Sequence, residues 1–557
     1  MVSTRLRRSL VLLLCLGVTV LTAGCPNSTR QDERQTEKTA TTGQYGGIYR
    51  KPLRHEPVTL DPAFVTDIYG ATVLQQVFDG LVQFDADLNV MPALATSWSA
   101  SRDGQIWTFH LRPSVTFHHD RAVTAEDFVY SFTRLLDPNV KSPRSWLFER
   151  VQGAEAFQSG SATHVEGLQA LDTETLQITL SQPYAPFISL LGMAQAKVVP
   201  REEVERLGTQ FGRRPVGTGP FRFSNWLPGK EINLEANHAY FEGRPFLDRL
   251  HYRIFPAADL QAVLTVFEQG HLEDAPILDL ERQRLINHPY YRFLRKPLLT
   301  TLFVWLNTRD GPLSHVKVRQ AINWAIDRDA INRTVRQNRH VQAQGVLPPG
   351  MPGYNPALEG YVYNPTRAKK LLAEAGYPDG KNLPTLELWS SVISPTALAE
   401  HKAIQKDLQR IGIAVELHTT ESWKQFKTEI LGKRPGAMYR SAWHADFPDP
   451  DNYLFTLFHS QSANNHAHYR NPEVDRLLEQ AQREIDYLKR LHVYRQIEAL
   501  IMADAPSVNL VYYAFEHLFQ PYVRGIEINA LGERYIPMKK IWLDTTHAAS
   551  PKPTRPK

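Results

Sequence analysis

Residues 440–452 gather side chains that could do chemistry into one short, turn-rich run. They read Arg-Ser-Ala-Trp-His-Ala-Asp-Phe-Pro-Asp-Pro-Asp-Asn, so a cation, an indole and three carboxylates lie close together. Pro448 and Pro450 interrupt any regular element, because proline lacks an N–H and disfavours a helical conformation in the residue before it. A carboxylate beside an indole face suits an ammonium group, through Coulomb attraction and a cation–π contact.

The three carboxylates of this run have different expected roles. Asp449 and Asp451 are placed to cap a helix that starts near Asn452, and capping is the role that we expect for them. Asp446 precedes the proline turn and lies three residues after Trp443, so capping does not account for it. Asp446 is therefore the candidate for binding a cationic group.

The same run resembles the Trp-x-x-Asp-aromatic-x-(Asp/Glu)-Pro signature of the oligopeptide- and dipeptide-binding proteins, which are family 5 solute receptors of ABC-type importers. In that family the first Asp of the signature pairs with the α-ammonium group of a peptide, and Asp446 holds this position. The resemblance also implies that Trp443 forms a wall of the ligand cavity. Arg440 matches an arginine that oligopeptide-type members carry six residues before the Asp, where it would meet a C-terminal carboxylate; a surface arginine is the alternative.

Further stretches carry the resemblance. Residues 92–98 (Pro-Ala-Leu-Ala-Thr-Ser-Trp), 107–112 (Trp-Thr-Phe-His-Leu-Arg) and 216–223 (Val-Gly-Thr-Gly-Pro-Phe-Arg-Phe) follow the family pattern closely. One departure concerns a tight turn, where the family usually has His-Asp-Gly and this chain has His-Asp-Arg, ending at Arg121. Because glycine is the residue that most readily adopts unusual backbone angles, the geometry of this turn is an open question.

Two more residues become candidates through the resemblance. A Glu in the opening segment lines the ligand cavity in the family, and Glu56 matches it; the alternative is a surface glutamate in a loop. The family also places cavity aromatics near residues 142–148. Trp146 is the candidate there, with core packing as the alternative.

The hydrophobic pattern predicts an α/β chain. Residues 106–112 alternate as a half-buried strand should, and Thr124 with Asp127 fits a capping box that opens a helix. From residue 368 onward strands and helices alternate, which favours a lobe with much parallel sheet and a ligand site at the carboxyl ends of its strands. The resemblance implies a two-lobed periplasmic-binding-protein fold, of type II in its large three-subdomain form, with a hinge and a central ligand cleft.

The N-terminus is typical of an exported lipoprotein. Arg5, Arg7 and Arg8 form a basic region, and residues 10–21 form an apolar run that is too short to span a bilayer. The following Leu-Thr-Ala-Gly-Cys, ending at Cys25, resembles the bacterial lipobox, in which the Cys is diacylated; an ordinary secretory signal is the alternative. We therefore expect anchoring through an acylated Cys25 at the periplasmic side or outer face of the cytoplasmic membrane, with the outer membrane as the alternative.

These observations divide the chain into expected segments. Residues 1–24 are the lipoprotein signal peptide, residues 25–44 a flexible tether and residues 546–557 a disordered tail. The expected lobes are 45–71 with 199–301 and 512–545 (lobe I, main subdomain), 72–198 (lobe I, additional subdomain) and 302–511 (lobe II).

Composition excludes several classes of protein. The chain has 557 residues, of which 42% are hydrophobic, and its 63 Lys and Arg nearly balance 58 Asp and Glu without any basic cluster, so we expect no nucleic-acid partner. With only two cysteines, one inside the signal peptide, the mature chain has no disulfide.

The sequence thus predicts a monomeric receptor that binds short peptides in an interlobe cleft and delivers them to an ABC-type permease of the inner membrane, without a cofactor. One alternative is a nickel-chelate, haem or other non-peptide solute, for which His444, His466 and His468 would be available. Another is a hydrolase that uses the carboxylate pair Asp446 and Asp449. No nucleophile elbow, zincin helix or P-loop accompanies that pair, so we expect no enzyme.

Overall fold

The computed structural model describes residues 43–255, 259–434 and 436–546. The expected signal peptide, Cys25, nearly all of the expected tether and nearly all of the expected tail lie outside these residues. Within the described ranges we find no helix with the length and apolar character that a membrane span requires.

The first sheet joins the beginning of the described chain to later segments. Its strands lie in the order β1, β10, β9, β8, with β1 parallel to β10 and the other neighbours antiparallel. Their bounds are β1 Ile48–Leu53, β8 Phe221–Leu227, β9 Glu231–Ala236 and β10 Arg249–Ile254. The strands of this sheet come from two separate stretches of chain, near residue 50 and at residues 221–254. The predicted main subdomain of lobe I is likewise built from separate stretches, and its exact boundaries stay a prediction.

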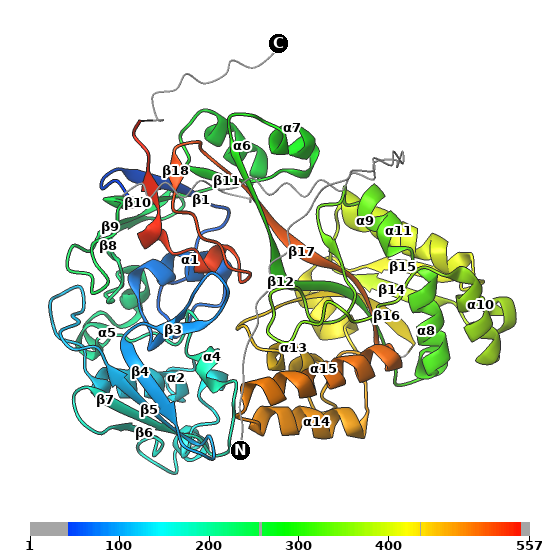
Figure 1. The fold of residues 1–557 in the computed structure, drawn as a ribbon, viewed down its shortest axis with the longest axis horizontal. Coiled ribbons are helices and arrows are strands. Elements are labelled where there is room, and N and C mark those ends of the chain that lie inside the picture. The colour runs from blue at the N-terminus through cyan, green and yellow to red at the C-terminus, as the bar shows by residue number, and fades with distance from the viewer. Residues whose placement is uncertain (1–42, 256–258, 435, 547–557) are drawn as a thin grey trace, which may run out of the picture. The chain divides into compact units, whose positions relative to one another are not determined.

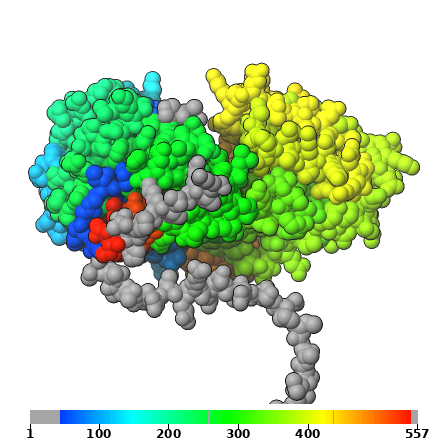
Figure 2. Space-filling model, turned by 90° about the horizontal axis from the view of Figure 1, so that it is seen from above, coloured from blue at the N-terminus to red at the C-terminus, as the bar shows by residue number. Residues whose placement is uncertain are grey.

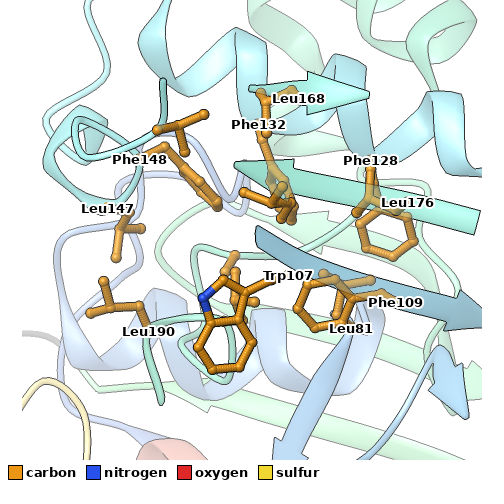
Figure 3. Packing of buried hydrophobic residues seen from close by; sticks show 14 of the residues in the cluster. Leu81, Trp107, Phe109, Phe128, Phe132, Leu147, Phe148, Leu168, Leu176 and Leu190 are labelled. Carbon is orange, nitrogen blue, oxygen red and sulfur yellow. The ribbon is translucent and has the colours of Figure 1, made fainter. Parts of the chain in front are cut away.

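The second sheet is antiparallel and lies within one stretch of chain. Its order is β4, β5, β7, β6, with bounds β4 Ala95–Ala100, β5 Ile106–Leu111, β6 Leu168–Ala170 and β7 Thr175–Thr179. Trp107 and Phe109 of β5 pack with Phe132 of helix α2 (Ala125–Leu136), as Figure 3 shows. The rings of Phe132 and Phe148 stack with their centres 4.2 Å apart. Phe447, from the run analysed above, belongs to this same buried cluster.

The third sheet is the largest and carries the loop of interest. Its order is β11, β17, β12, β16, β14, β15, and a short β13 also pairs with β17. The bounds are β11 Asp274–Pro276, β12 Arg292–Leu306, β13 Val341–Gln342, β14 Leu386–Ser390, β15 Val415–Thr419, β16 Ala437–His444 and β17 Ser507–Phe519. The long strands β12 and β17 pair with each other; β11 joins them at one end and β16 at the other (Figure 1).

The helices of the described part that Figure 1 labels, besides α2, have the following bounds. They are α1 Ile68–Val77, α4 Phe187–Leu190, α5 Arg201–Leu207, α6 Leu260–Glu268, α7 Arg282–Ile286, α8 Val316–Ala325, α9 Arg328–Thr334, α10 Pro365–Glu374, α11 Pro395–Gln409, α13 Asp451–Phe458, α14 Pro472–Arg483 and α15 Tyr487–Asp504. Shorter pieces are α3 Ala154–Gln158, α12 Trp423–Gln425 and the two-stranded pairs β2 Val82–Phe84 with β3 Val90–Pro92 and β18 Val523–Arg524 with β19 Trp542–Leu543.

Helices cover both faces of the third sheet. Alternate residues of a strand point to opposite faces, so Met438 packs with α8, α10 and α11, whereas Tyr439 packs with α13, α14 and α15. In the surface view of Figure 2, the yellow and yellow-green residues of this region lie on one side and the blue to cyan-green residues of the first two sheets on the other. The sheet is therefore a layer that helices cover on both faces, and β16 lies within it.

Most of the elements that we predicted from sequence are present. The strand at residues 106–112 is β5, and Thr124 with Asp127 forms the predicted capping box at the start of α2. The predicted parallel sheet is confirmed only for β14, β15 and β16, because β12 and β17 are antiparallel to their neighbours. One of the helices in the alternating region is irregular, since the short α12 is followed by a π-helical turn, Phe426–Ile430.

The turn that lacks the family's glycine closes with an aspartate instead. Asp120 adopts a positive φ of 70°, a conformation that Asp tolerates better than most residues. Arg121 then stays outside the left-handed region, and its guanidinium pairs with Asp127 at 2.6 Å. The turn therefore does not need a glycine at position 121.

Glu498 should give folding a pH dependence. This α15 residue is 1% exposed, and its Oε1 accepts the N–H groups of Val346 and Leu347, both at 2.8 Å. Burial raises the pKa of Glu498 to about 7. The folded state therefore binds this proton more tightly than the unfolded state, so stability should fall as pH rises through the interval between the ordinary glutamate pKa and about 7.

Glu498→Gln keeps an acceptor oxygen and removes the titration. We expect its unfolding free energy relative to wild type to rise by about 1–3 kcal/mol between about pH 5 and about pH 8. Urea denaturation at both pH values measures this difference. Glu359→Gln, at an exposed position, is the control and should show no such trend; a parallel pH profile for Glu498→Gln and wild type would refute the assignment.

Candidate functional site

A cavity of about 530 Å³ lies where two distant segments of chain meet. One wall comes from residues 144–190, including Trp146 and Tyr184, and the other from residues 443–482, including Trp443 and Asp446. Three of the five predicted binding residues therefore line one cavity: Asp446, Trp443 and Trp146. The volume lies within the range of about 300–1,000 Å³ that is usual for ligand pockets.

One buried amide holds the two main candidate residues in place. The Oδ1 atom of Asn452 accepts the indole N–H of Trp443 at 3.1 Å and the backbone N–H of Asp446 at 3.0 Å. Asn452 is 4% exposed and lies in the first turn of α13, immediately after the proline turn. The turn thus brings the helix start back against the end of β16, and the sequence reasoning gave Asn452 no such role.

Asp446 presents a carboxylate that no described part of the protein pairs with. Its side chain is half-buried, and within the described residues it makes no hydrogen bond or ion pair. Arg144 lies on the same cavity and interacts electrostatically with Asp446 without forming an ion pair. A half-buried carboxylate that the fold leaves unpaired is suited to a cationic ligand group.

The other two carboxylates of the turn are structural. Asp449 accepts the N–H of Asp451 at 3.1 Å and also pairs with Arg490 at 2.7 Å. The N-cap of α13 is Pro450, so the capping prediction is wrong for Asp451, which is the first helical residue, and Asp449 contacts the helix start from one position before the N-cap. Asp451 starts α13 and accepts hydrogen bonds from Tyr184 at 2.8 Å and Gln482 at 2.9 Å. Burial, together with the charge of Asp449, raises the pKa of Asp451.

Arg440 does not line this cavity. Its side chain is 8% exposed, and its Nε pairs with Glu400 at 3.1 Å. Arg336, which the sequence reasoning missed, binds the same carboxylate through its Nε at 2.7 Å. Two arginines thus share one buried glutamate, and the hydroxyl of Tyr513 lies 3.5 Å from Arg440 Nη2. The long sequence separation of Arg336, Glu400 and Arg440 left no local signal for this cluster.

β16 has an unpaired edge between Arg440 and the loop. β12 pairs with β16 as far as His444, whereas β14 pairs only with residues 437–439. Backbone bonds of Ala437 and Ala445 point to the β12 side. By the alternation of an antiparallel ladder, Ala442 and His444 direct their backbone N–H and C=O groups to the side where the described chain supplies no strand.

Glu56 lies outside the cavity that contains Asp446. Its carboxylate accepts the indole N–H of Trp226 at 2.9 Å and the backbone N–H of Gly229 at 3.1 Å, and it pairs with Arg213 at 3.3 Å. These contacts tie its loop to β8, and Glu56 is not among the residues that line the cavity. Its ligand role therefore stays a prediction without support from its position.

The histidines do not assemble into a metal centre within the described residues. Burial lowers the pKa of His444 to about 3 and that of His466 to about 4. In the described part of the chain, the group with metal-ligating geometry is Asp274, His517 and Glu533, and the ammonium of Lys51 pairs with both of its carboxylates. A lysine already supplies the positive charge that a metal would bring.

Comparison with known proteins identifies one matching family and relatives that align with most of the chain. A family model described as bacterial extracellular solute-binding proteins, family 5 Middle, matches residues 89–465. The chain is 30% identical over 538 residues to heme-binding protein A of Haemophilus influenzae, covering 91% of this chain and 95% of that protein. It is 30% identical over 489 residues to the periplasmic oligopeptide-binding protein OppA of Salmonella typhimurium, covering 84% and 88%.

A solved structure is also similar. The periplasmic binding protein DppA of Helicobacter pylori, an ABC transporter-associated protein in complex with the peptide STSA, aligns with a TM-score of 0.72 and 28% identity. The alignment covers 90% of this chain and 99% of that one.

Asn452→Leu tests whether this amide positions the cavity wall. The change leaves the Trp443 indole N–H and the Asp446 N–H without their acceptor, so we expect a loss of about 1–3 kcal/mol in stability and an altered tryptophan emission. Thermal unfolding and fluorescence measure both. Asn464→Leu changes a second amide of the same cavity, one that is half-buried, and is the control. Equal effects of the two variants would contradict the proposed role.

Proposed function

The chain belongs to the bacterial extracellular solute-binding proteins of family 5, and from this premise we propose that it is a membrane-anchored receptor for short peptides. It binds them in an interlobe cleft and delivers them to an ABC-type permease. The observation that carries the peptide proposal is the unpaired, half-buried carboxylate of Asp446 beside the free edge of β16.

Two predictions are confirmed by the family and the fold. The relatives are solute-binding proteins, and the chain is likewise a binding protein rather than an enzyme. The fold class is also as predicted, an α/β, two-lobed protein of the type II class with a hinge and a central cleft.

The geometry supports recognition of the peptide's amino end. Asp446 offers an anion, and the Trp443 indole beside it offers a π face, so an α-ammonium group gains both Coulomb and cation–π stabilisation. Trp146, which packs against the core cluster of the second sheet, closes the opposite wall. Both aromatic residues are held by contacts that do not depend on the ligand.

The free edge of β16 supports recognition of the backbone. A peptide that lies along residues 440–444 can pair with the N–H and C=O groups of Ala442 and His444 by strand addition. Such pairing gives affinity without dependence on the peptide's side chains. A binding protein with these contacts accepts many sequences.

The Arg440 end of the β16 edge supports recognition of the peptide's C-terminal carboxylate. Arg440 and Arg336 share the single buried Glu400, which leaves one positive charge uncompensated within that cluster. Arg440 lies six residues before Asp446, a span of about 20 Å in an extended strand. A peptide of a few residues, with its amino end on Asp446, would reach the arginine pair with its C-terminal carboxylate.

The cellular location of the protein is part of the same proposal. The family is extracellular, and the N-terminal Leu-Thr-Ala-Gly-Cys pattern supports anchoring through a lipid on Cys25. An anchored monomer on the outer side of the cytoplasmic membrane would remain near its permease. A non-peptide ligand, such as haem or a nickel chelate, is the second candidate function, and the similarity to heme-binding protein A is the observation that favours it.

Native mass spectrometry of the mature chain with Cys25→Ser tests the peptide proposal. We expect a heterogeneous bound mass that resolves into short peptides and that falls at least tenfold in Asp446→Asn, because truncating one partner of a desolvated charge pair costs about 2–5 kcal/mol. Glu149→Gln removes an exposed carboxylate from the rim of the same cavity and should retain the peptides. A haem or metal adduct in place of peptides would overturn the proposal.

A further inference from the structure

Besides Asp446, the cavity contains an arginine, Arg144, for which the described residues supply no ion-pair partner. Arg144 is half-buried, and among the described residues it forms no ion pair with a carboxylate. Its Nε donates to the carbonyl of Val65 at 3.1 Å and its Nη2 to the carbonyl of Thr66 at 3.3 Å. These neutral acceptors hold the guanidinium in one orientation without neutralising its charge.

Arg144 interacts electrostatically with one carboxylate and one further cation near the cavity. Burial lowers the pKa of Arg144, the charge of Arg534 lowers it further, and the charge of Asp446 acts in the opposite direction. Arg144 and Asp446 thus interact across the cavity without an ion pair between them. Two unpaired opposite charges facing one cavity are complementary to a ligand that carries both charges.

The second arginine of the cavity has a different environment. The Arg150 guanidinium lies 4.3 Å from the ring centre of Tyr184, and its Nη2 is 3.5 Å from Gln482 Oε1. Tyr184 and Gln482 are both partners of the buried Asp451. Arg150 therefore supports the packing between the two cavity walls, and it serves as a matched control for Arg144.

We propose that this cavity recognises a zwitterionic head group, with its ammonium on Asp446 and a neighbouring carboxylate on Arg144. The inference rests on the proposed peptide-binding function and narrows its ligand class. Peptides whose first residue is Asp or Glu have this chemistry, because a side-chain carboxylate lies near the α-ammonium. A γ-linked glutamyl head group has it as well, because its ammonium and its free α-carboxylate share one carbon.

The preference follows from the cost of leaving a partly buried charge unpaired. A peptide with a neutral first residue places its ammonium group on Asp446 but brings no carboxylate to Arg144. A carboxylate that meets the preoriented guanidinium forms charge-assisted hydrogen bonds at little further entropic cost. We expect a gain of about 10- to 100-fold in affinity over the uncharged amide analogue, the range for a hydrogen bond to a charged group.

Isothermal titration calorimetry on the full mature chain tests the proposal with Glu-Ala-Ala, Gln-Ala-Ala and γ-Glu-Ala-Ala. The expected result in wild type is at least tenfold tighter binding of Glu-Ala-Ala or γ-Glu-Ala-Ala than of Gln-Ala-Ala. Whichever acidic peptide binds more tightly identifies the source of the head group. In Arg144→Met the advantage should disappear, whereas in Arg150→Met it should persist even if all affinities fall together.

Several outcomes would overturn the inference, and they differ from failure of the proposed function. Binding of all three peptides that depends on Asp446 but shows equal affinities for Glu-Ala-Ala, γ-Glu-Ala-Ala and Gln-Ala-Ala in wild type removes the inference and leaves the peptide function intact. An acidic preference that survives in Arg144→Met also refutes it. Absence of binding by any peptide refutes the proposed function itself. The comparison of the two acidic peptides with Gln-Ala-Ala in wild type requires no variant and so does not depend on whether Arg144→Met folds.

Discussion

Two carboxylates must be buried in the turn between β16 and α13, and the structure around the cavity depends on how they are satisfied. Asp449 pairs with Arg490 of α15, and Asp451 accepts from Gln482 of α14 and from Tyr184 on the opposite wall. Removing either set of partners would leave an uncompensated buried charge, which is strongly destabilising. The turn is therefore held from three directions, and Trp443 and Asp446 take their positions from it.

This arrangement separates structural charges from available ones. The buried acids Asp449 and Asp451 are paired with other side chains of the protein. Asp446, a few residues earlier, is half-buried and unpaired among the described residues. The same contrast holds for the cations, because Arg490 is committed to Asp449 and Arg144 is bound to backbone carbonyls. The pattern of paired and unpaired charges, rather than the number of charges, distinguishes the cavity as a site for a ligand.

Local patterns in the sequence predict several of the elements and several of the residues that line the cavity. The alternation in β5, the capping box of α2 and the role of Asp449 at the start of α13 all depend on residues within a few positions of one another. Asp446, Trp443 and Trp146 were identified by residue type and by resemblance, and they line one cavity. The ligand roles themselves rest on the proposal above.

Features that depend on distant segments were not predictable in this way. Arg440 shares the buried Glu400 with Arg336, and no spacing in the sequence relates these three positions. Arg144 acquires its orientation from the carbonyls of Val65 and Thr66, almost eighty residues earlier. Pairings of this kind are set by tertiary contacts, which single-sequence patterns do not report.

The two walls of the cavity have separate origins in the chain, and this has an evolutionary consequence. Asp446, Trp443 and the turn that holds them belong to a segment that folds against α13, α14 and α15, whereas Trp146 and Arg144 belong to a segment that packs on the second sheet. Substitution or recombination within residues 144–190 can remodel one wall without disturbing the anchoring carboxylate. Ligand preference can in this way diverge between paralogues while the mode of anchoring is inherited unchanged.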